Sequence, residues 1–350
     1  MIHPPPQTQR RDVKAFLDRL GWGGAEIATL AGDASNRRYD RLTHPETDAR
    51  AVLMDAPPQK GEDVGPFLNV AAYLTALGLS APRILGEDRE QGYLLLEDLG
   101  DDLFARLLRL EPEAEETLYH AAADVLLTLG RNAPPAGLPP LDASGMARLA
   151  ALAWTWYAPG ITEDPGTGPD PEPMLATLTP ILQDVMDDGS ARVLAQRDFH
   201  AENLIWLPER DGAARVGLLD FQDAVAGHPA YDLVSLLEDA RRDVRADTVT
   251  RVKDRFIHLS GSDAAAFELA YAALGAQRNL RILGVFARLS LHFAKPHYVD
   301  LIPRVWGHLH TDLAHPRLAG LRDLVLRDLP EPTPKRLQRL KDRCGTIPTL

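Results

Sequence analysis

The segments QRDFHAEN, residues 196–203, and LLDFQD, residues 218–223, carry the pattern that decides the fold. In the first segment Asp198 precedes Asn203 by five residues, and the second segment contributes Asp220. Phosphoryl transfer from ATP requires a carboxylate that accepts the proton of the attacking hydroxyl, and oxygen ligands that hold Mg²⁺ against the phosphates. This spacing therefore predicts Asp198 as a catalytic base, and Asn203 and Asp220 as magnesium ligands.

The residues between the two segments explain why the segments belong together. Apolar stretches at 204–207 and 216–219 flank a turn at 208–212, which is typical of a hairpin. A hairpin returns the chain to its starting point, so we expect Asp220 beside Asn203.

Composition excludes several classes of protein. A chain of 350 residues with 45% hydrophobic and 25% charged residues is typical of a globular protein with two domains. The formal net charge of −12 argues against a nucleic-acid partner. The single cysteine, Cys344, allows no intrachain disulfide and no thiolate zinc cluster. The start is polar and rich in proline, and no apolar run is long enough to span a membrane, so we expect a cytoplasmic protein with no membrane association and no obligate protein partner.

Hydrophobic periodicity divides the chain near Gly100. Before this point we expect strands at 25–30, 37–42, 51–54, 83–85 and 93–96, and helices at 11–20 and 67–77. After it we expect mostly helices, at 103–110, 115–129, 147–157, 174–186 and from 229 onward, with short strands near 193–195, 204–207 and 216–219. The pattern predicts a smaller mixed lobe over residues 1–99 and a larger helical lobe over residues 100–350.

The chain from Ala31 to Arg304, with its Asp198, Asn203 and Asp220 pattern, resembles the aminoglycoside phosphotransferase and choline kinase group, which is related to the protein kinases. The resemblance implies an α/β (α+β) two-lobe protein-kinase-like fold, in which a small lobe with an antiparallel sheet binds the nucleotide and a larger, mostly helical lobe carries catalysis and substrate binding. It implies ATP and Mg²⁺ as cofactors, with ATP between the lobes.

Several further segments are similar to one branch of that group, the bacterial cell-wall-recycling kinases. They are AGDASNRR (31–38), VLMDAPP (52–58), LLLEDLG (94–100), LDFQDAV (219–225), YDLVSLL (231–237) and QRNLRILGVFARL (277–289). The resemblance implies ATP-dependent phosphorylation of the anomeric C1 hydroxyl of N-acetylmuramate, N-acetylglucosamine or both, giving a sugar 1-phosphate for peptidoglycan recycling. The expected partner is thus a small-molecule sugar.

The nucleotide side departs from the protein-kinase pattern. Protein kinases carry a lysine on the third strand, whereas this chain has Met54 at about that place. We propose that Arg37 or Arg38 supplies the missing charge, and that the Ser35 hydroxyl contacts phosphate; either arginine is equally consistent with a surface position. The resemblance also places an interlobe hinge at residues 97–99, where Glu97 and Leu99 offer backbone groups to adenine. A smaller departure is Gln196, where the wider group has histidine, at a position of structural support.

The substrate side is less defined. His200 is either a packed loop histidine or a substrate contact, and Asp223 belongs either to the site or to the scaffold. Arg278 and Arg281 share one helix face with Arg288 and His292. That face is either solvated or binds the lactyl carboxylate of muramate through arginine. Two further expectations concern the scaffold: Asp232 resembles the family's buried aspartate that braces the catalytic loop, and the aromatic residues Trp154, Trp156 and Tyr157 are expected mainly in the core.

Two alternative functions stay open. One is a kinase of the same fold for an aminoglycoside, choline or a homoserine-like molecule; the arginines near Arg278 argue against a cationic substrate. The other is a non-catalytic nucleotide-binding pseudokinase. The absent strand lysine favours this alternative, and the intact Asp198, Asn203 and Asp220 argue against it.

Overall fold

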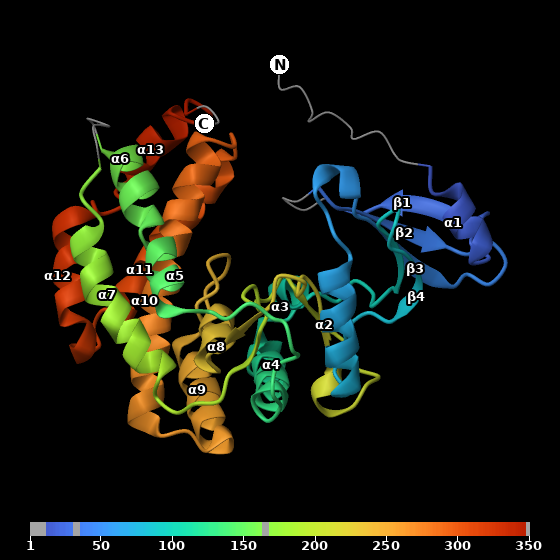
Figure 1. Cartoon of the computed structure of the whole chain (residues 1–350), viewed down its shortest axis with the longest axis horizontal. Coiled ribbons are helices and arrows are strands. Elements are labelled where there is room, and N and C mark those ends of the chain that lie inside the picture. Colours follow the sequence, from blue (N-terminus) through green and yellow to red (C-terminus); the bar gives the residue numbers. More distant parts are fainter. Residues whose placement is uncertain (1–11, 31–35, 163–167, 348–350) are drawn as a thin grey trace. The chain divides into compact units, whose positions relative to one another are not determined.

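The computed structural model describes residues 12–30, 36–162 and 168–347 (Figure 1). The chain divides into two compact units. The small unit is residues 1–101 together with 217–222, and the large unit is residues 102–216 together with 223–350.

A five-stranded antiparallel sheet forms the centre of the small unit, with the strand order β1-β2-β3-β5-β4. Its strands are β1 (Glu26–Thr29), β2 (Arg38–Thr43), β3 (Arg50–Asp55), β4 (Ile84–Asp88) and β5 (Tyr93–Glu97). Its helices are α1 (Lys14–Arg19), η1 (Pro58–Lys60) and α2 (Gly65–Ala76). All five strands and both α-helices were predicted, the strands from short segments bounded by turn formers and the helices from the helical spacing of apolar residues.

Helix α1 covers one face of the sheet. Its buried Phe16 and Leu17 belong to one cluster with Leu42, Leu53 and Leu95 of the strands. The same cluster includes Ala51 on β3 and Tyr93 on β5, each two positions before the cluster leucine of its strand and therefore on the same face. Burial of each such side chain contributes roughly 1.5–3 kcal/mol, so this cluster is the core of the small unit.

The short segment 217–222 joins the small unit although it lies far from it in sequence. The Leu218 amide donates to the Ser80 carbonyl at 2.9 Å, and the Phe221 ring packs on the Phe67 ring of α2 with centroids 4.8 Å apart. Asp220 therefore belongs to the small unit.

The large unit is mostly helical, as predicted. Its helices are α3 (Phe104–Leu110), η2 (Pro112–Ala114), α4 (Glu115–Gly130), α5 (Ala143–Ala150), the π-helical η3 (Ala153–Tyr157), α6 (Ala158–Ile161), α7 (Glu172–Met186), η4 (Gly212–Arg215), α8 (Ala230–Leu237), α9 (Ala246–Ser260), α10 (Ala264–Leu291), η5 (Pro296–Leu301), α11 (Ile302–Asp312), η6 (Pro316–Leu318), α12 (Ala319–Asp328) and α13 (Pro334–Asp342). In the described ranges, no helix combines the length and the apolar character that crossing a membrane requires.

Four short strands accompany these helices: β6 (Val193–Ala195), β7 (Leu204–Trp206), β8 (Val216–Leu218) and β9 (Val225–Gly227). β9, which periodicity did not predict, pairs antiparallel with β6. β7 and β8 are the arms of the predicted hairpin, in which the Leu207 amide donates to the Arg215 carbonyl at 2.8 Å. The loop between β6 and β7 is the segment QRDFHAEN.

One helix expectation needs correction. The continuous helix expected over residues 147–157 is divided into α5 and the π-helical η3. Next to this break, Gly284 of α10 approaches the Leu152 backbone so closely that a Cβ atom would lie 2.2 Å from the Leu152 carbonyl carbon. Trp154 and Tyr157 are buried as expected, and their polar atoms donate to Asp328 (3.0 Å) and to the Pro330 carbonyl (2.6 Å).

Candidate active site

The β6–β7 loop brings Asp198 and Asn203 together. The Asn203 side-chain amide donates to the Asp198 carbonyl oxygen at 2.9 Å, and the Asn203 backbone amide donates to the His200 carbonyl at 2.8 Å. Since the amide nitrogen is used within the loop, the Oδ1 atom is the side-chain atom left to act as a metal ligand. The Asp198 side chain is half-buried at the same loop.

A buried aspartate of α8 braces the start of this loop, as expected from the resemblance. The Asp232 carboxylate accepts the Gln196 amide at 2.6 Å and the Arg197 amide at 2.9 Å. Burial raises the pKa of Asp232 to about 6, against the two amide hydrogen bonds, which lower it. The buried Gln196 fits the structural role that was predicted for its position.

Two site residues have left-handed backbones. Arg197 has φ +76° and Asp220 has φ +55°. This region costs a non-glycine residue roughly 1–2 kcal/mol, and aspartate tolerates it better than most. Such strain persists only where neighbouring groups hold the backbone, and it is frequent at functional sites.

Asp220 is held within the small unit. The Gln222 side-chain amide donates to its Oδ1 atom at 2.7 Å. Asp198 and Asn203 belong to the large unit and Asp220 to the small one, so the expected neighbourhood of Asp220 and Asn203 stays a prediction.

No group of three or more His, Cys, Asp or Glu side chains that could hold a metal occurs in the described residues. The donors that fit magnesium here are the amide oxygen of Asn203 and the carboxylate of Asp220, which are hard oxygen ligands. Mg²⁺ needs few protein ligands, because water and phosphate oxygens complete its octahedron.

His200 is packed rather than exposed. Its side chain is 3% exposed, and the Arg241 guanidinium donates to its Nε2 atom at 3.1 Å. Burial and the Arg241 charge lower the pKa of His200 to about 4, so the ring is neutral at pH 7 with its proton on Nδ1. That Nδ1 atom has no hydrogen-bond partner among the described residues. Asp223, the other uncertain candidate, is exposed.

Both arginines proposed for phosphate binding are ion-paired within the small unit. Arg37 pairs with Glu62 at 2.8 Å, and Arg38 pairs with Asp40 at 3.1 Å. Arg38 also donates to the Thr29 hydroxyl at 2.8 Å. Ser35 lies outside the described residues.

The third strand, β3, has a buried apolar residue at about the position where protein kinases carry a lysine. Met54 is fully buried and lies opposite Tyr39 and Leu94 in the neighbouring strands. At the predicted hinge, the Glu97 amide donates to the Arg83 carbonyl at 2.8 Å, and its carboxylate accepts the Arg83 amide at 3.2 Å. Leu99 follows as a buried residue.

Arg278 and Arg281, the two arginines of α10 that were substrate-binding candidates, have different environments. Arg278 is only 4% exposed and donates to the Ser235 hydroxyl at 2.9 Å and the Glu238 carbonyl at 3.5 Å. The interpretation of this face as solvated is therefore wrong for Arg278, because a spacing of three and seven identifies a shared face but not its burial. Arg281 is half-buried and donates to the Tyr231 hydroxyl at 3.4 Å.

Sequence reasoning missed Ser235 and Arg241. Ser235 donates to the Arg197 carbonyl at 3.2 Å, and Arg241 contacts both His200 and, at 3.0 Å, Glu202. Ser235 carries a usable signal, since it lies three positions after Asp232 and so shares its helix face. Arg241 carries no such signal in the sequence, because its contacts with His200 and Glu202 depend on the turn that ends α8.

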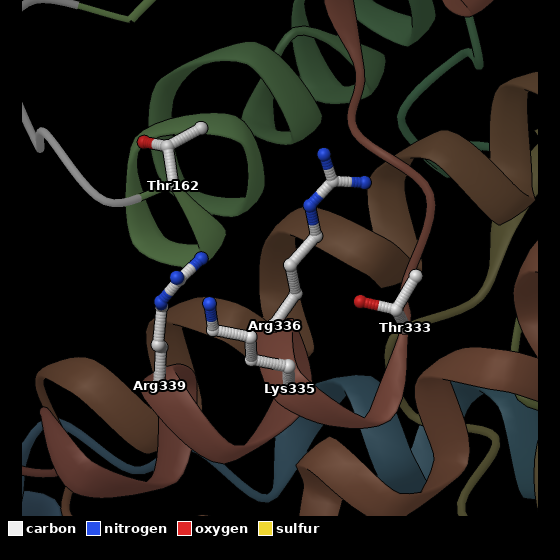
Figure 2. A pocket seen from close by; sticks show the side chains of 5 residues that line it. All are labelled: Thr162, Thr333, Lys335, Arg336 and Arg339. Atoms are coloured by element: carbon white, nitrogen blue, oxygen red, sulfur yellow. The ribbon is translucent and has the colours of Figure 1, made fainter.

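A cavity of about 440 Å³ lies elsewhere in the large unit. Figure 2 shows the Lys335 and Arg339 side chains extending from α13 on the side of Thr162, while the Arg336 side chain extends away from Thr162. The cavity is lined by Thr162, Thr333, Lys335, Arg336 and Arg339. None of these is a predicted site residue.

Known proteins share this architecture and much of this sequence. The phosphotransferase enzyme family model matches residues 26–274. An N-acetylmuramate/N-acetylglucosamine kinase from Caulobacter vibrioides is 39% identical, covering 93% of this chain and 98% of its own. A protein of the same name from Pseudomonas aeruginosa is 34% identical, with coverages of 89% and 91%.

Two solved structures show the same fold. An ethanolamine kinase from Plasmodium vivax superposes with a TM-score of 0.56 at 12% identity, covering 85% of this chain and 83% of its own. An ADP-bound aminoglycoside phosphotransferase superposes with a TM-score of 0.55 at 15% identity, with coverages of 86% and 98%. These likenesses confirm the expected two-lobe, protein-kinase-like α/β fold. The chain therefore belongs to the phosphotransferase enzyme family and is a small-molecule kinase.

Proposed function

We propose that this kinase transfers the γ-phosphate of ATP to the anomeric C1 hydroxyl of N-acetylmuramate, N-acetylglucosamine or both, and that the sugar 1-phosphate serves peptidoglycan recycling. The observation that carries the proposal is the braced β6–β7 loop, in which Asn203 is anchored to the Asp198 carbonyl. The names of the relatives from Caulobacter and Pseudomonas support the substrate class.

Asp198 is the proposed base. It accepts the proton of the C1 hydroxyl while the C1 oxygen forms its bond to the γ-phosphorus and the bond from that phosphorus to the ADP oxygen breaks. Asn203 Oδ1 and the Asp220 carboxylate are the proposed magnesium ligands. The ion, when bound, neutralises the charge on the phosphates.

The remaining nucleotide contacts are proposed for the small unit. Arg37 or Arg38 faces the phosphates together with Ser35, and backbone groups of Glu97 and Leu99 meet adenine. The ion pairs of Arg37 with Glu62 and of Arg38 with Asp40 imply that a phosphate competes with a carboxylate for either guanidinium.

On the substrate side, we propose contacts from His200, Asp223 and Arg281. His200 offers its Nδ1 hydrogen as a neutral donor. Arg281 suits the lactyl carboxylate that distinguishes muramate, because its guanidinium is only half-buried. Arg278 is buried and already donates to the Ser235 hydroxyl, and we assign it a further role below.

The test is ADP release with Mg-ATP and each sugar, alongside the methyl glycosides, in which the C1 hydroxyl is blocked. We expect release with at least one free sugar, none with its glycoside, and an acid-labile 1-phosphate as product by ³¹P NMR. Equal release with the glycoside would reject the C1 hydroxyl as acceptor. Release only with an aminoglycoside, choline or homoserine would reject the sugar assignment.

A further inference from the structure

Helix α8 holds both backbone polar groups of Arg197. Asp232 accepts the Arg197 amide at 2.9 Å, and Ser235 donates to the Arg197 carbonyl at 3.2 Å. The two side chains are three positions apart and so lie on one face of the helix. Because Arg197 is in the left-handed region at φ +76°, it needs such restraint on both sides.

The Ser235 hydroxyl is itself oriented from α10. Ser235 is fully buried, and Arg278 donates to its oxygen at 2.9 Å. A hydroxyl that accepts from a guanidinium directs its own proton elsewhere, and here the Arg197 carbonyl receives it. The result is a directed chain of hydrogen bonds from Arg278 through Ser235 to the peptide that joins Arg197 to Asp198.

A buried acid pair compensates the charge of Arg278. The Glu238 and Asp312 carboxyls hydrogen-bond to each other, and the Asn279 amide donates to both, at 2.7 and 2.9 Å. Burial raises the pKa of both carboxyls, and the nearby Arg278 charge opposes this rise. The two buried acids therefore lie where they offset the charge of the buried Arg278 guanidinium.

We propose that Ser235 and Arg278 are positioning residues, which fix the Arg197–Asp198 peptide and thereby aim the Asp198 carboxylate. This inference rests on the proposed function, in which Asp198 is the base. The amide nitrogen of that peptide belongs to Asp198, so rotation of the peptide moves the Asp198 Cα atom and its carboxylate. A misplaced base slows the proton transfer without weakening binding of ATP or sugar.

The test compares Ser235→Ala with Ser290→Ala in the intact enzyme. Ser290 is a matched control, since it is also fully buried and donates to a backbone carbonyl, that of Leu340 at 3.1 Å, with no contact to the loop. We expect kcat with Mg-ATP and sugar to fall roughly tenfold or more in Ser235→Ala, with KM for both substrates within about twofold of wild type. Ser290→Ala should keep the wild-type kcat. Each variant loses a hydrogen bond to a backbone carbonyl, and Ser235→Ala also loses the bond from Arg278, so we expect a larger fall in Tm for Ser235→Ala than for Ser290→Ala.

Two further variants complete the design. Ser235→Thr keeps the hydroxyl and should recover most of the kcat that Ser235→Ala loses. Equal kcat in Ser235→Ala and Ser290→Ala, or a Ser235→Ala defect confined to KM, would overturn the positioning role. Asp198→Asn is measured alongside, and wild-type turnover in that variant would reject the base itself, which separates failure of the proposed function from failure of this inference.

Discussion

Folding keeps the residue His200 neutral. Burial, Arg241 and Arg278 oppose its protonation, while Asp239 and Asp198 favour it, and the net effect lowers its pKa to about 4. An unfolded histidine has a pKa near ~6.5, so between these values the unfolded chain binds more protons than the folded one. The stabilisation from His200 is therefore complete above about pH 6.5 and is lost as the pH falls toward 4.

His200→Gln should remove this pH dependence. From pH 7 to pH 5 we expect wild type to lose about 2 kcal/mol more unfolding free energy than the variant. Urea unfolding at both pH values measures the difference. The raised pKa of Asp232 makes the unfolding free energy change with pH in the opposite direction, but Asp232 is present in both proteins, so its contribution cancels in the comparison. Equal losses would show that His200 titrates normally.

At single residues, the sequence predicts the role of a side chain better than it predicts whether that side chain is buried. Asp232 could be assigned as a loop brace, because its place after the catalytic segment matches a known pattern and both its oxygens accept loop amides. Arg278 could not, because helical spacing shows which residues share a face and not what covers that face. Its charge is offset by the buried carboxyls of Glu238 and Asp312, two residues that lie far apart in sequence.

The element that organises the large unit is α10, with 28 residues. It begins at an aspartate cap, where Asp263 accepts the Ala266 amide at 2.8 Å, and it is buried along most of its length. Gly284 allows the Leu152 backbone to approach it, and Gly275 allows the Asp312 carboxylate to approach. Small residues in this helix thus set how closely its neighbours pack.

Gly284→Ala tests this close packing. The new methyl group would meet the Leu152 backbone, and since backbone cannot yield cheaply we expect a loss of roughly 1–3 kcal/mol or more. Gly307→Ala in α11 is the matched control, because nothing lies within 4 Å of its added Cβ and alanine favours helix by about 0.5–1 kcal/mol. Chemical denaturation should show a lower unfolding free energy for Gly284→Ala and a higher one for Gly307→Ala than for wild type. Destabilisation of the same size in both variants would contradict this account.

Sequence patterns predicted most elements, including the three-residue strands β6, β7 and β8, but not β9 or the π-helical turn. The strands of the small unit are segments of four to six residues, and all five predicted strands are present. The three-residue β9 exists because β6 supplies a partner, which local sequence does not reveal. The π-helical turn after α5 lies where α10 approaches Leu152, and that contact is long-range.

The whole molecule divides into two compact units. Leu53 is buried in the sheet core of the small unit, and Leu283 is fully buried on α10 of the large unit. Multi-domain proteins commonly depart from two-state unfolding, because each core melts cooperatively on its own. The change in periodicity near Gly100 indicates a division of the chain, whereas the place of residues 217–222 in the small unit depends on tertiary contacts that local sequence does not reveal.

Calorimetry of Leu53→Ala and Leu283→Ala tests the independence of the cores. Each substitution should lower the unfolding free energy of its unit by roughly 2–5 kcal/mol, because each removes a buried leucine side chain. We expect two thermal transitions in wild type. Leu53→Ala should lower the midpoint temperature of one transition, and Leu283→Ala should lower that of the other. A single transition that both variants lower alike would show one cooperative molecule.

The central claim is that Asp198 accepts the proton of a sugar hydroxyl during phosphoryl transfer. The most direct measurement is sugar-dependent ADP release by wild type, Asp198→Asn and Glu202→Gln with saturating Mg-ATP. Glu202 is an exposed carboxylate of the same loop, so its variant controls for loss of negative charge there. We predict that kcat falls at least 10²-fold in Asp198→Asn and stays near wild type in Glu202→Gln. Equal turnover by wild type and Asp198→Asn would contradict the account.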